Sequence, residues 1–199
     1  MSAVDENIVR EFFELNGFLV CQRRKYIVQA RHKSADEEVD LIVLNTAAAA
    51  GDAPPTEFEI TSKTISQVSR AVVAVKGWHT GVFAPGLLAN QPKIFRFVEK
   101  RVIEEAERLV GGDGLLKILI VPGLPRDVKT RQRSIEVLRS RGVDGVISFK
   151  SILQELIGSV AKNHNYQKSD LLQILRLLKN YELLKGPQME FGWKRRFRG

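Results

Sequence analysis

Two ionisable side chains stand at the ends of apolar runs that are typical of buried strands. Asp40 lies at the start of a run that ends at Asn45, and Lys76 closes a second run that begins at Ala71. A buried charge is costly unless it is paired or bound to a metal. We therefore interpret Asp40 and Lys76 either as a structural ion pair or as parts of a site. Ala74, and not a carboxylate, stands two residues before Lys76 on the same face of that strand.

Basic residues gather in three places, and the chain carries a formal net charge of +8. A charge of this sign favours a polyanion partner such as DNA, bound through its phosphates with release of counterions. The alternative is that these residues form ordinary solvated faces of a basic protein. The first cluster contains Arg23, Arg24, Lys25, Arg31 and Lys33, the second contains Lys129, Arg131, Arg133, Arg139 and Arg141, and the third is the tail from Trp193 to Gly199.

The 199 residues suffice for one sizeable domain with a short appendage. We predict a domain over residues 1–161, followed by a C-terminal helix and basic tail over residues 162–199. Cys21 is the single cysteine and lies in an apolar stretch, so we expect it to be buried, in a protein of the reducing cytoplasm. The polar, acidic N-terminus predicts no signal peptide. No apolar run approaches the roughly 20 residues of a membrane-spanning helix, so we expect no membrane partner.

The apolar periodicity predicts a mixed sheet flanked by helices, in the order α-β-β-β-α-β-α-β-α-α. We expect Val39–Asn45, Ala71–Lys76 and Leu115–Val121 to be adjacent strands of that sheet. The last predicted helix, Asp170–Leu184, is leucine-rich on more than one face. That pattern fits packing against the core or a contact in a homodimer, and the sequence does not separate the two. The remaining predictions are helices at Asp5–Asn16, Lys93–Val110, Asp127–Arg141 and Ser151–Ala161, and strands at Phe18–Val28 and Asp144–Phe149.

This order, with an aspartate on the second strand and a lysine ending the third, resembles the PD-(D/E)XK nuclease superfamily. The resemblance is greatest to archaeal Holliday-junction resolvases and small RecB-like nucleases. Those proteins carry an acid in the first helix about a dozen residues before Gly-Phe, here Glu6, and a Val-Asp-Leu segment, here Val39-Asp40-Leu41. They also carry an acid-x-Lys pair, here Ala74-Val75-Lys76. The resemblance covers roughly residues 5–121.

The resemblance implies a restriction-endonuclease-like three-layer α/β sandwich that acts on DNA phosphodiesters. It implies Asp40, Lys76 and Glu6 as catalytic residues, with Asp40 and Glu6 as ligands of Mg²⁺ (or Mn²⁺). Phosphodiester hydrolysis uses such a cation to neutralise developing charge and to activate water. Hard carboxylate oxygens suit Mg²⁺, and a lysine stabilises charge or orients the attacking water.

Ala74 departs from the family pattern, because alanine cannot bind a metal ion or accept a proton. Three interpretations stay open. The site works with Glu6 and Asp40 and a backbone carbonyl, or a carboxylate has moved, or the domain binds without cutting. The carboxylates that could have moved are Glu38, Glu57 and Glu59.

Two further side chains follow Lys76 directly. His79 could donate to a phosphate or relay a proton, or it could be a loop histidine with a local hydrogen bond. Trp78 could stack on a base, but we expect it to be buried under its loop. The sequence therefore predicts a weakly active, metal-dependent nuclease-like protein or, as the alternative, a catalytically degenerate module of the same fold that binds nucleic acid or a protein. We include His79 with the first basic cluster among the predicted nucleic-acid-binding residues.

Overall fold

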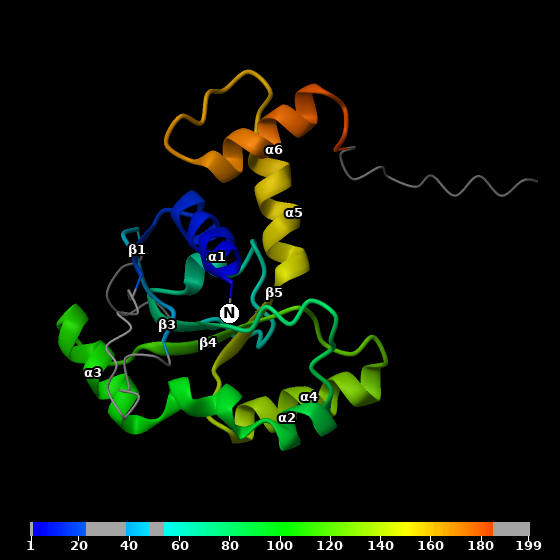
Figure 1. Cartoon of the computed structure of the whole chain (residues 1–199). Coiled ribbons are helices and arrows are strands. Elements are labelled where there is room, and N and C mark those ends of the chain that lie inside the picture. Colours follow the sequence, from blue (N-terminus) through cyan, green and yellow to red (C-terminus); the bar gives the residue numbers. More distant parts are fainter. Residues whose placement is uncertain (1, 23–38, 48–53, 185–199) are drawn as a thin grey trace, which may run out of the picture. The chain divides into compact units, whose positions relative to one another are not determined.

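The computed structural model describes residues 2–22, 39–47 and 54–184, which divide into two compact units, Met1–Leu156 and Ile157–Gly199. The described residues of the first unit form an α/β fold with a five-stranded mixed sheet in the order β1-β2-β3-β4-β5 (Figure 1). The strands are β1 (Phe18–Gln22), β2 (Leu41–Asn45), β3 (Arg70–Val75), β4 (Leu116–Val121) and β5 (Gly145–Ser148). The helices are α1 (Ala3–Leu15), α2 (Pro85–Asn90), α3 (Lys100–Val110), α4 (Val128–Ser140), α5 (Phe149–Ser159) and α6 (Asp170–Asn180), with 3₁₀ helices η2 (Ile65–Gln67) and η3 (Pro92–Val98).

Strand pairing confirms the prediction that β2, β3 and β4 are neighbours. The first three strands form an antiparallel meander, and β4 and β5 then run parallel to β3. Five of the six residues of β3 are buried, since helices cover both faces of the sheet there. In the first unit, α1 lies on one side of the sheet, and α2, α3 and α4 lie on the other (Figure 1).

Helix α1 packs through a narrow apolar stripe. Ser2 caps it, because its hydroxyl accepts a hydrogen bond from Val4 N at 3.2 Å. Val9, Phe12 and Phe13 are buried at positions i, i+3 and i+4, and the helix contacts β1, β2 and β3. Gly17, at φ +82°, ends the helix as predicted and turns the chain into β1.

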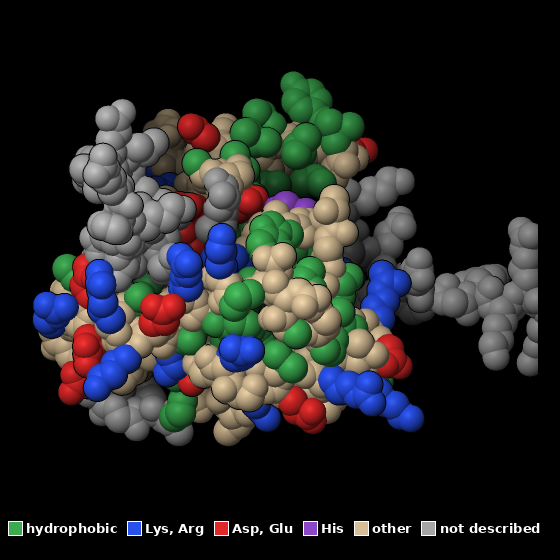
Figure 2. Space-filling view, turned by 60° about the horizontal axis from the view of Figure 1, so that its bottom comes forward, with side chains coloured by type: hydrophobic (Ala, Val, Ile, Leu, Met, Phe, Trp, Pro, Cys, Tyr) green, Lys and Arg blue, Asp and Glu red, His purple; other side chains and the backbone are tan. Residues whose placement is uncertain are grey.

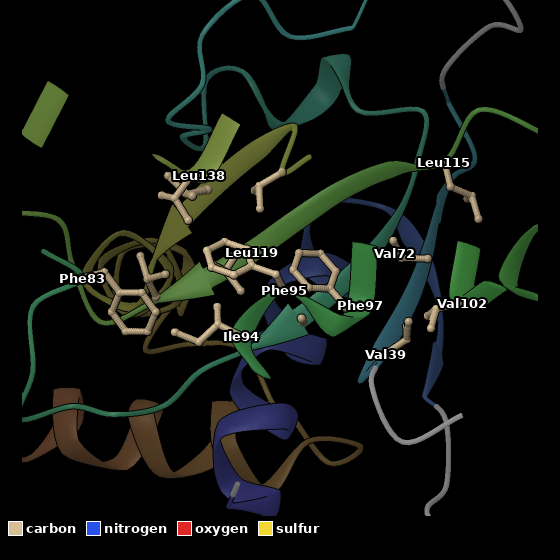
Figure 3. Close-up of a cluster of buried hydrophobic side chains, with 14 of the residues drawn as sticks. Val39, Val72, Phe83, Ile94, Phe95, Phe97, Val102, Leu115, Leu119 and Leu138 are labelled. Carbon is tan, nitrogen blue, oxygen red and sulfur yellow. The ribbon is translucent and has the colours of Figure 1, made fainter. Parts of the chain in front are cut away.

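The opposite face carries a large apolar cluster. Phe95 and Phe97 from η3 lie there with Leu119 of β4 and Val72 of β3 (Figure 3). Ala74 belongs to the same cluster and is fully buried. The cluster also contains side chains of α3 and α4, so this layer is fixed to the sheet by burial of apolar surface.

The structure differs from the sequence predictions in the region of η3 and α3 and in strand β1. The single helix expected at Lys93–Val110 is divided at Glu99, whose extended backbone separates the 3₁₀ helix η3 from α3. Cys21 is exposed, because β1 is an edge strand on which only Phe18 is fully buried. The part of the predicted strand beyond Gln22 lies outside the described residues.

The second unit contains the end of α5 and helix α6. Ser169 caps α6 by accepting a hydrogen bond from Leu172 N at 3.2 Å. Lys179 Nζ donates to Val160 O at 2.6 Å, which ties the last turn of α6 to the segment after α5. Leu172 and Leu175 are buried, whereas Ile174 and Leu177 are exposed, so only part of the leucine-rich surface is covered. The helices in the described ranges lack the length and apolar character needed to cross a membrane.

Candidate nucleic-acid interface at the sheet edge

Four strands end, and one begins, at a single edge of the sheet. The C-terminal ends of β1, β3, β4 and β5 meet there, together with the start of β2, because of the antiparallel and parallel pairings. We call this the carboxyl edge and define it by Gln22, Asp40, residues 76–79, residues 122–123 and Ser148. Ligands of α/β sheets commonly bind outside the carboxyl ends of strands. The edge is therefore the natural place for a site in this fold.

Asp40 lies just before β2, and its side chain forms a hydrogen bond with the backbone of the neighbouring strand β3. It is only 1% exposed, and its Oδ2 accepts a hydrogen bond from Val75 N at 2.8 Å. Its own N–H donates to Val73 O at 3.1 Å. The carboxylate thus satisfies a strand N–H that points away from β4, and it contacts the residue directly before Lys76. Asp40 therefore lies beside the end of β3, one residue from Lys76 along that chain segment.

Lys76 follows β3 and lines a cavity of about 810 Å³. Its N–H donates to Ile120 O at 2.9 Å, which fixes the backbone beside β4. The side chain is partly buried. The cavity is bounded by residues from the start of α1 and from the end of β3, which are Ser2, Val4, Asp5, Val75, Lys76, Gly77, Trp78 and His79.

Asp5, and not Glu6, is the acid of α1 that enters this cavity. Asp5 is 9% exposed, and its Oδ1 lies 3.0 Å from His79 Nε2. Glu6 accepts a hydrogen bond from Gln22 Nε2 at 3.1 Å, at the end of β1. The spacing of Asp5 in the sequence indicates that it lies on the buried face of the helix, because the residue is four positions before Val9 and seven before Phe12. The family motif does not use this spacing.

Gly77 makes the close approach of α1 and β3 possible. A Cβ atom built on Gly77 would overlap Asp5 Oδ2 and lie 2.7 Å from Asp5 Cγ. Real Cβ atoms essentially never make such contacts. A glycine directly after Lys76 is therefore the feature that admits the Asp5 carboxylate beside His79.

In the part of the chain that the structure describes, no group of three or more His, Cys, Asp or Glu side chains lies together so that it could hold a metal ion. One oxygen of each predicted ligand, Asp40 and Glu6, already accepts a hydrogen bond from the protein. Mg²⁺ or Mn²⁺ stays a prediction from the resemblance.

A second cavity, of about 680 Å³, lies over the ends of β4 and β5 and shares His79 with the first. Among the residues that the structure describes, Arg126, Arg131 and Lys150 line it, with Glu59 as the one acid. Glu59 sits on a short segment that bridges to Val146 of β5. Three cations facing one acid give the cavity an excess of positive charge.

Arg131 is the cation that Glu59 neutralises. Its Nε donates to Glu59 Oε1 at 2.7 Å, and its Nη2 contacts Glu59 Oε2. The hydrogen bond to Glu59 raises the pKa of Arg131 above its usual value. The excess charge of this cavity therefore comes from Arg126 and Lys150, which are both exposed.

Two other arginines of the predicted basic helix pack on aromatic rings. The guanidinium of Arg139 lies 5.0 Å from the ring centre of Phe58, and that of Arg141 lies 5.5 Å from the ring centre of Phe95. Part of the predicted basic cluster therefore forms cation–π contacts inside the protein. On the surface that Figure 2 presents, Lys and Arg side chains alternate with Asp and Glu and do not form one continuous patch.

The structure places His79 and Trp78 at the edge, next to Lys76. His79 contacts Asp5, and its ring lies edge-on against Phe149 at 4.7 Å. The expectation that Trp78 is buried is wrong: the residue is 43% exposed. Its ring rests on buried Phe83, with ring centres 5.6 Å apart. The predicted basic residues Arg23, Arg24, Lys25, Arg31 and Lys33, and the tail from Trp193, lie outside the described residues.

Comparison with protein-family models, curated proteins and solved structures finds no match to this chain. Any function assigned to the carboxyl edge therefore rests on the geometry and charge of the residues at that edge.

Proposed function

We propose that this protein binds DNA through phosphate contacts at the carboxyl edge of a restriction-endonuclease-like core, with little or no cleavage. The observation that carries the proposal is the cavity over β4 and β5, where Arg126 and Lys150 add positive charge beyond the ion pair of Arg131 with Glu59. Phosphate oxygens are recognised by such groups with little dependence on base sequence. Lys76, in the adjoining cavity, adds a fourth cation on the same edge.

The order of the elements supports the choice of core. A helix, an antiparallel three-stranded meander and a parallel crossover strand follow one another, with Asp40 before the second strand and Lys76 after the third. This is the arrangement that the superfamily resemblance implies. The net charge of +8 is consistent with a polyanionic ligand.

The environment of Ala74 is the reason for proposing little or no cleavage. Its side chain is fully buried among apolar residues such as Phe83 and Leu119. No carboxylate stands at this position, and Asp40 is bonded to the Val75 N–H. Removal of one transition-state interaction of a few kcal/mol lowers a rate about a hundredfold or more.

A second candidate function is a Mg²⁺-dependent endonuclease with Asp40, Lys76 and Glu6 as catalytic residues. One observation favours it: Asp40 contacts the residue before Lys76, and Lys76 shares its cavity with another acid, Asp5. A catalytic role for these residues would follow the family motif, which combines carboxylates with a lysine at the strand ends.

Titration of a 20-base-pair duplex at several salt concentrations tests binding. We expect affinity to fall with salt, with a logarithmic slope of about −0.9 per phosphate contact. The double variant Arg126→Ala/Lys150→Ala should reduce the slope by about 2, whereas Lys100→Ala, which lines neither cavity, should leave it unchanged. Binding that is absent, or independent of salt, contradicts the proposal.

Incubation of the same duplex with Mg²⁺ or Mn²⁺ separates the two candidates. DNA binding without cleavage supports the binding function. Cleavage that is abolished in both Asp40→Asn and Lys76→Ala supports the endonuclease. Asp40→Asn keeps an oxygen that can accept the Val75 N–H, so its folding should be less affected than that of Asp40→Ala.

A further inference from the structure

We propose that Trp78 is a platform on which an unpaired base stacks, so that the ligand of the carboxyl edge is DNA with unpaired bases beside the bound phosphate. This inference rests on the proposed function and specifies the ligand class. Trp78 lines the same cavity as Lys76 and is 43% exposed, although it is one of the largest apolar side chains of the protein.

The indole is held in place and is not a loosely attached surface group. Its ring lies on Phe83, which is fully buried, with 30° between the ring planes. Phe83 N donates to Gly123 O at 3.1 Å, which joins this loop to the end of β4. Within the loop, Gly81 N donates to Trp78 O at 2.9 Å. The ring is therefore fixed before a ligand arrives, and its ordering costs little on binding.

The surroundings combine apolar contact area with positive charge. Val4 and Val82 are 63% and 50% exposed, and they line the first and second cavities respectively. Lys76 lies two residues before Trp78 in the chain and lines the first cavity with it. Proteins that hold single-stranded nucleic acid pair a stacking aromatic ring with cations that follow the phosphates.

A continuous duplex does not present a free base face to such a ring. Its bases are stacked on one another, and the outer surface offers phosphates and groove edges. A single strand, a gap or a branch point exposes base faces next to phosphates that Lys76 can contact. The exposed ring beside a cation thus favours DNA with unpaired bases over the uninterrupted helix.

Fluorescence can report on Trp78 alone, because the chain contains only one other tryptophan, Trp193, which can be replaced. In a Trp193→Phe background, we expect oligo-dT to quench the emission of Trp78. An abasic oligonucleotide of the same length should bind more weakly and quench less, since it offers phosphates without bases. Stacking on one aromatic side chain predicts a difference in affinity of about 5- to 150-fold.

Two substitutions separate stacking from packing. Trp78→Leu keeps apolar bulk over Phe83 but has no π-face, so it should abolish the preference for oligo-dT over the abasic strand. Trp78→Phe should keep most of that preference. Equal affinity of the parent protein for the two oligonucleotides overturns the stacking inference and leaves phosphate binding intact. Failure to bind either oligonucleotide or duplex overturns the proposed function itself.

Discussion

Gly77 determines how closely the first helix approaches the third strand. A methyl group at this position would overlap the Asp5 carboxylate, and Asp5 is held by the packing of α1 and by His79. Either the helix or the loop must then move. The contact between Asp5 and His79 is thus a consequence of the residue type at position 77.

We expect Gly77→Ala to lower the free energy of unfolding by about 1–3 kcal/mol, as overpacking of a close contact does. Urea denaturation measures the change. Gly81→Ala is the matched control in the same loop, because its nearest neighbour, Trp78 O, would lie at an ordinary 3.5 Å. A stability decrease of equal size in both variants, or none in Gly77→Ala, contradicts the steric argument.

The sequence pointed to some residues of the carboxyl edge and not to others. The sequence draws attention to Asp40 and Lys76 because a charge at the end of an apolar strand has few explanations, and the pairing of β2 with β3 places Asp40 beside the end of the strand that Lys76 follows. Their roles stay predictions. The resemblance gives Glu6 as the acid of the first helix but fixes its position only approximately, and Asp5, which the sequence did not single out, is the acid that lines the cavity of Lys76. The exposure of Trp78 depends on how a loop folds over Phe83, which no periodic pattern encodes.

At the scale of elements, β3 is apolar on both faces, and Ala74 is a part of that packing. The residue is fully buried, and Val72, Phe83 and Leu119 belong to the same cluster. Strand alternation suggested that positions 74 and 76 point together toward a site. In the structure Lys76 lies beyond the last residue of the strand and lines a cavity, whereas Ala74 lies inside the core.

We therefore expect Ala74→Glu to destabilise the protein by about 3–5 kcal/mol, because it leaves an uncompensated charge in the core. Thermal and urea unfolding measure this change. Ala89→Glu, on an exposed position of α2, should change stability by less than about 0.5 kcal/mol. A stable Ala74→Glu protein that cleaves DNA faster than the parent would show that position 74 faces the site, and it would favour the endonuclease candidate.

Elements with strong local signals were predicted well. Such signals are carried by the three apolar strands, by the glycine after α1 and by the capped helix α4. Asp127 caps α4 by accepting hydrogen bonds from the backbone N–H and the hydroxyl of Thr130. These hydrogen bonds lower the pKa of Asp127 below its usual value. The break at Glu99 was not predicted. The amphipathic pattern continues across it, so the break is set by packing of Phe95 and Phe97 on the sheet and not by local propensity.

At the scale of the whole molecule, the positive charge is unevenly distributed along the chain. Residues 185–199 carry five Lys or Arg side chains and one Glu, which is half of the formal net charge of +8. Electrostatic attraction to a polyanion depends on the number of phosphates neutralised. The tail therefore contributes to DNA affinity in our proposal, in addition to the carboxyl edge.

Deletion of residues 185–199 should weaken DNA binding and reduce the salt slope by about 0.9 for each phosphate that is no longer neutralised. Titration at several salt concentrations measures both. A full-length variant with the same charges removed should behave like the deletion if charge is the cause. It changes Lys185, Lys194, Arg195, Arg196 and Arg198 to Gln. An unchanged slope in both proteins would assign the affinity to the remaining basic residues.

The exposed edge strand also has a practical use for spectroscopy. Cys21 is the only cysteine of the chain, it is exposed, and it precedes Gln22 at the carboxyl edge. A thiol-reactive dye can therefore be attached at one defined point without any engineered cysteine. Energy transfer from this dye to a labelled oligonucleotide would give the polarity of the bound strand along the sheet.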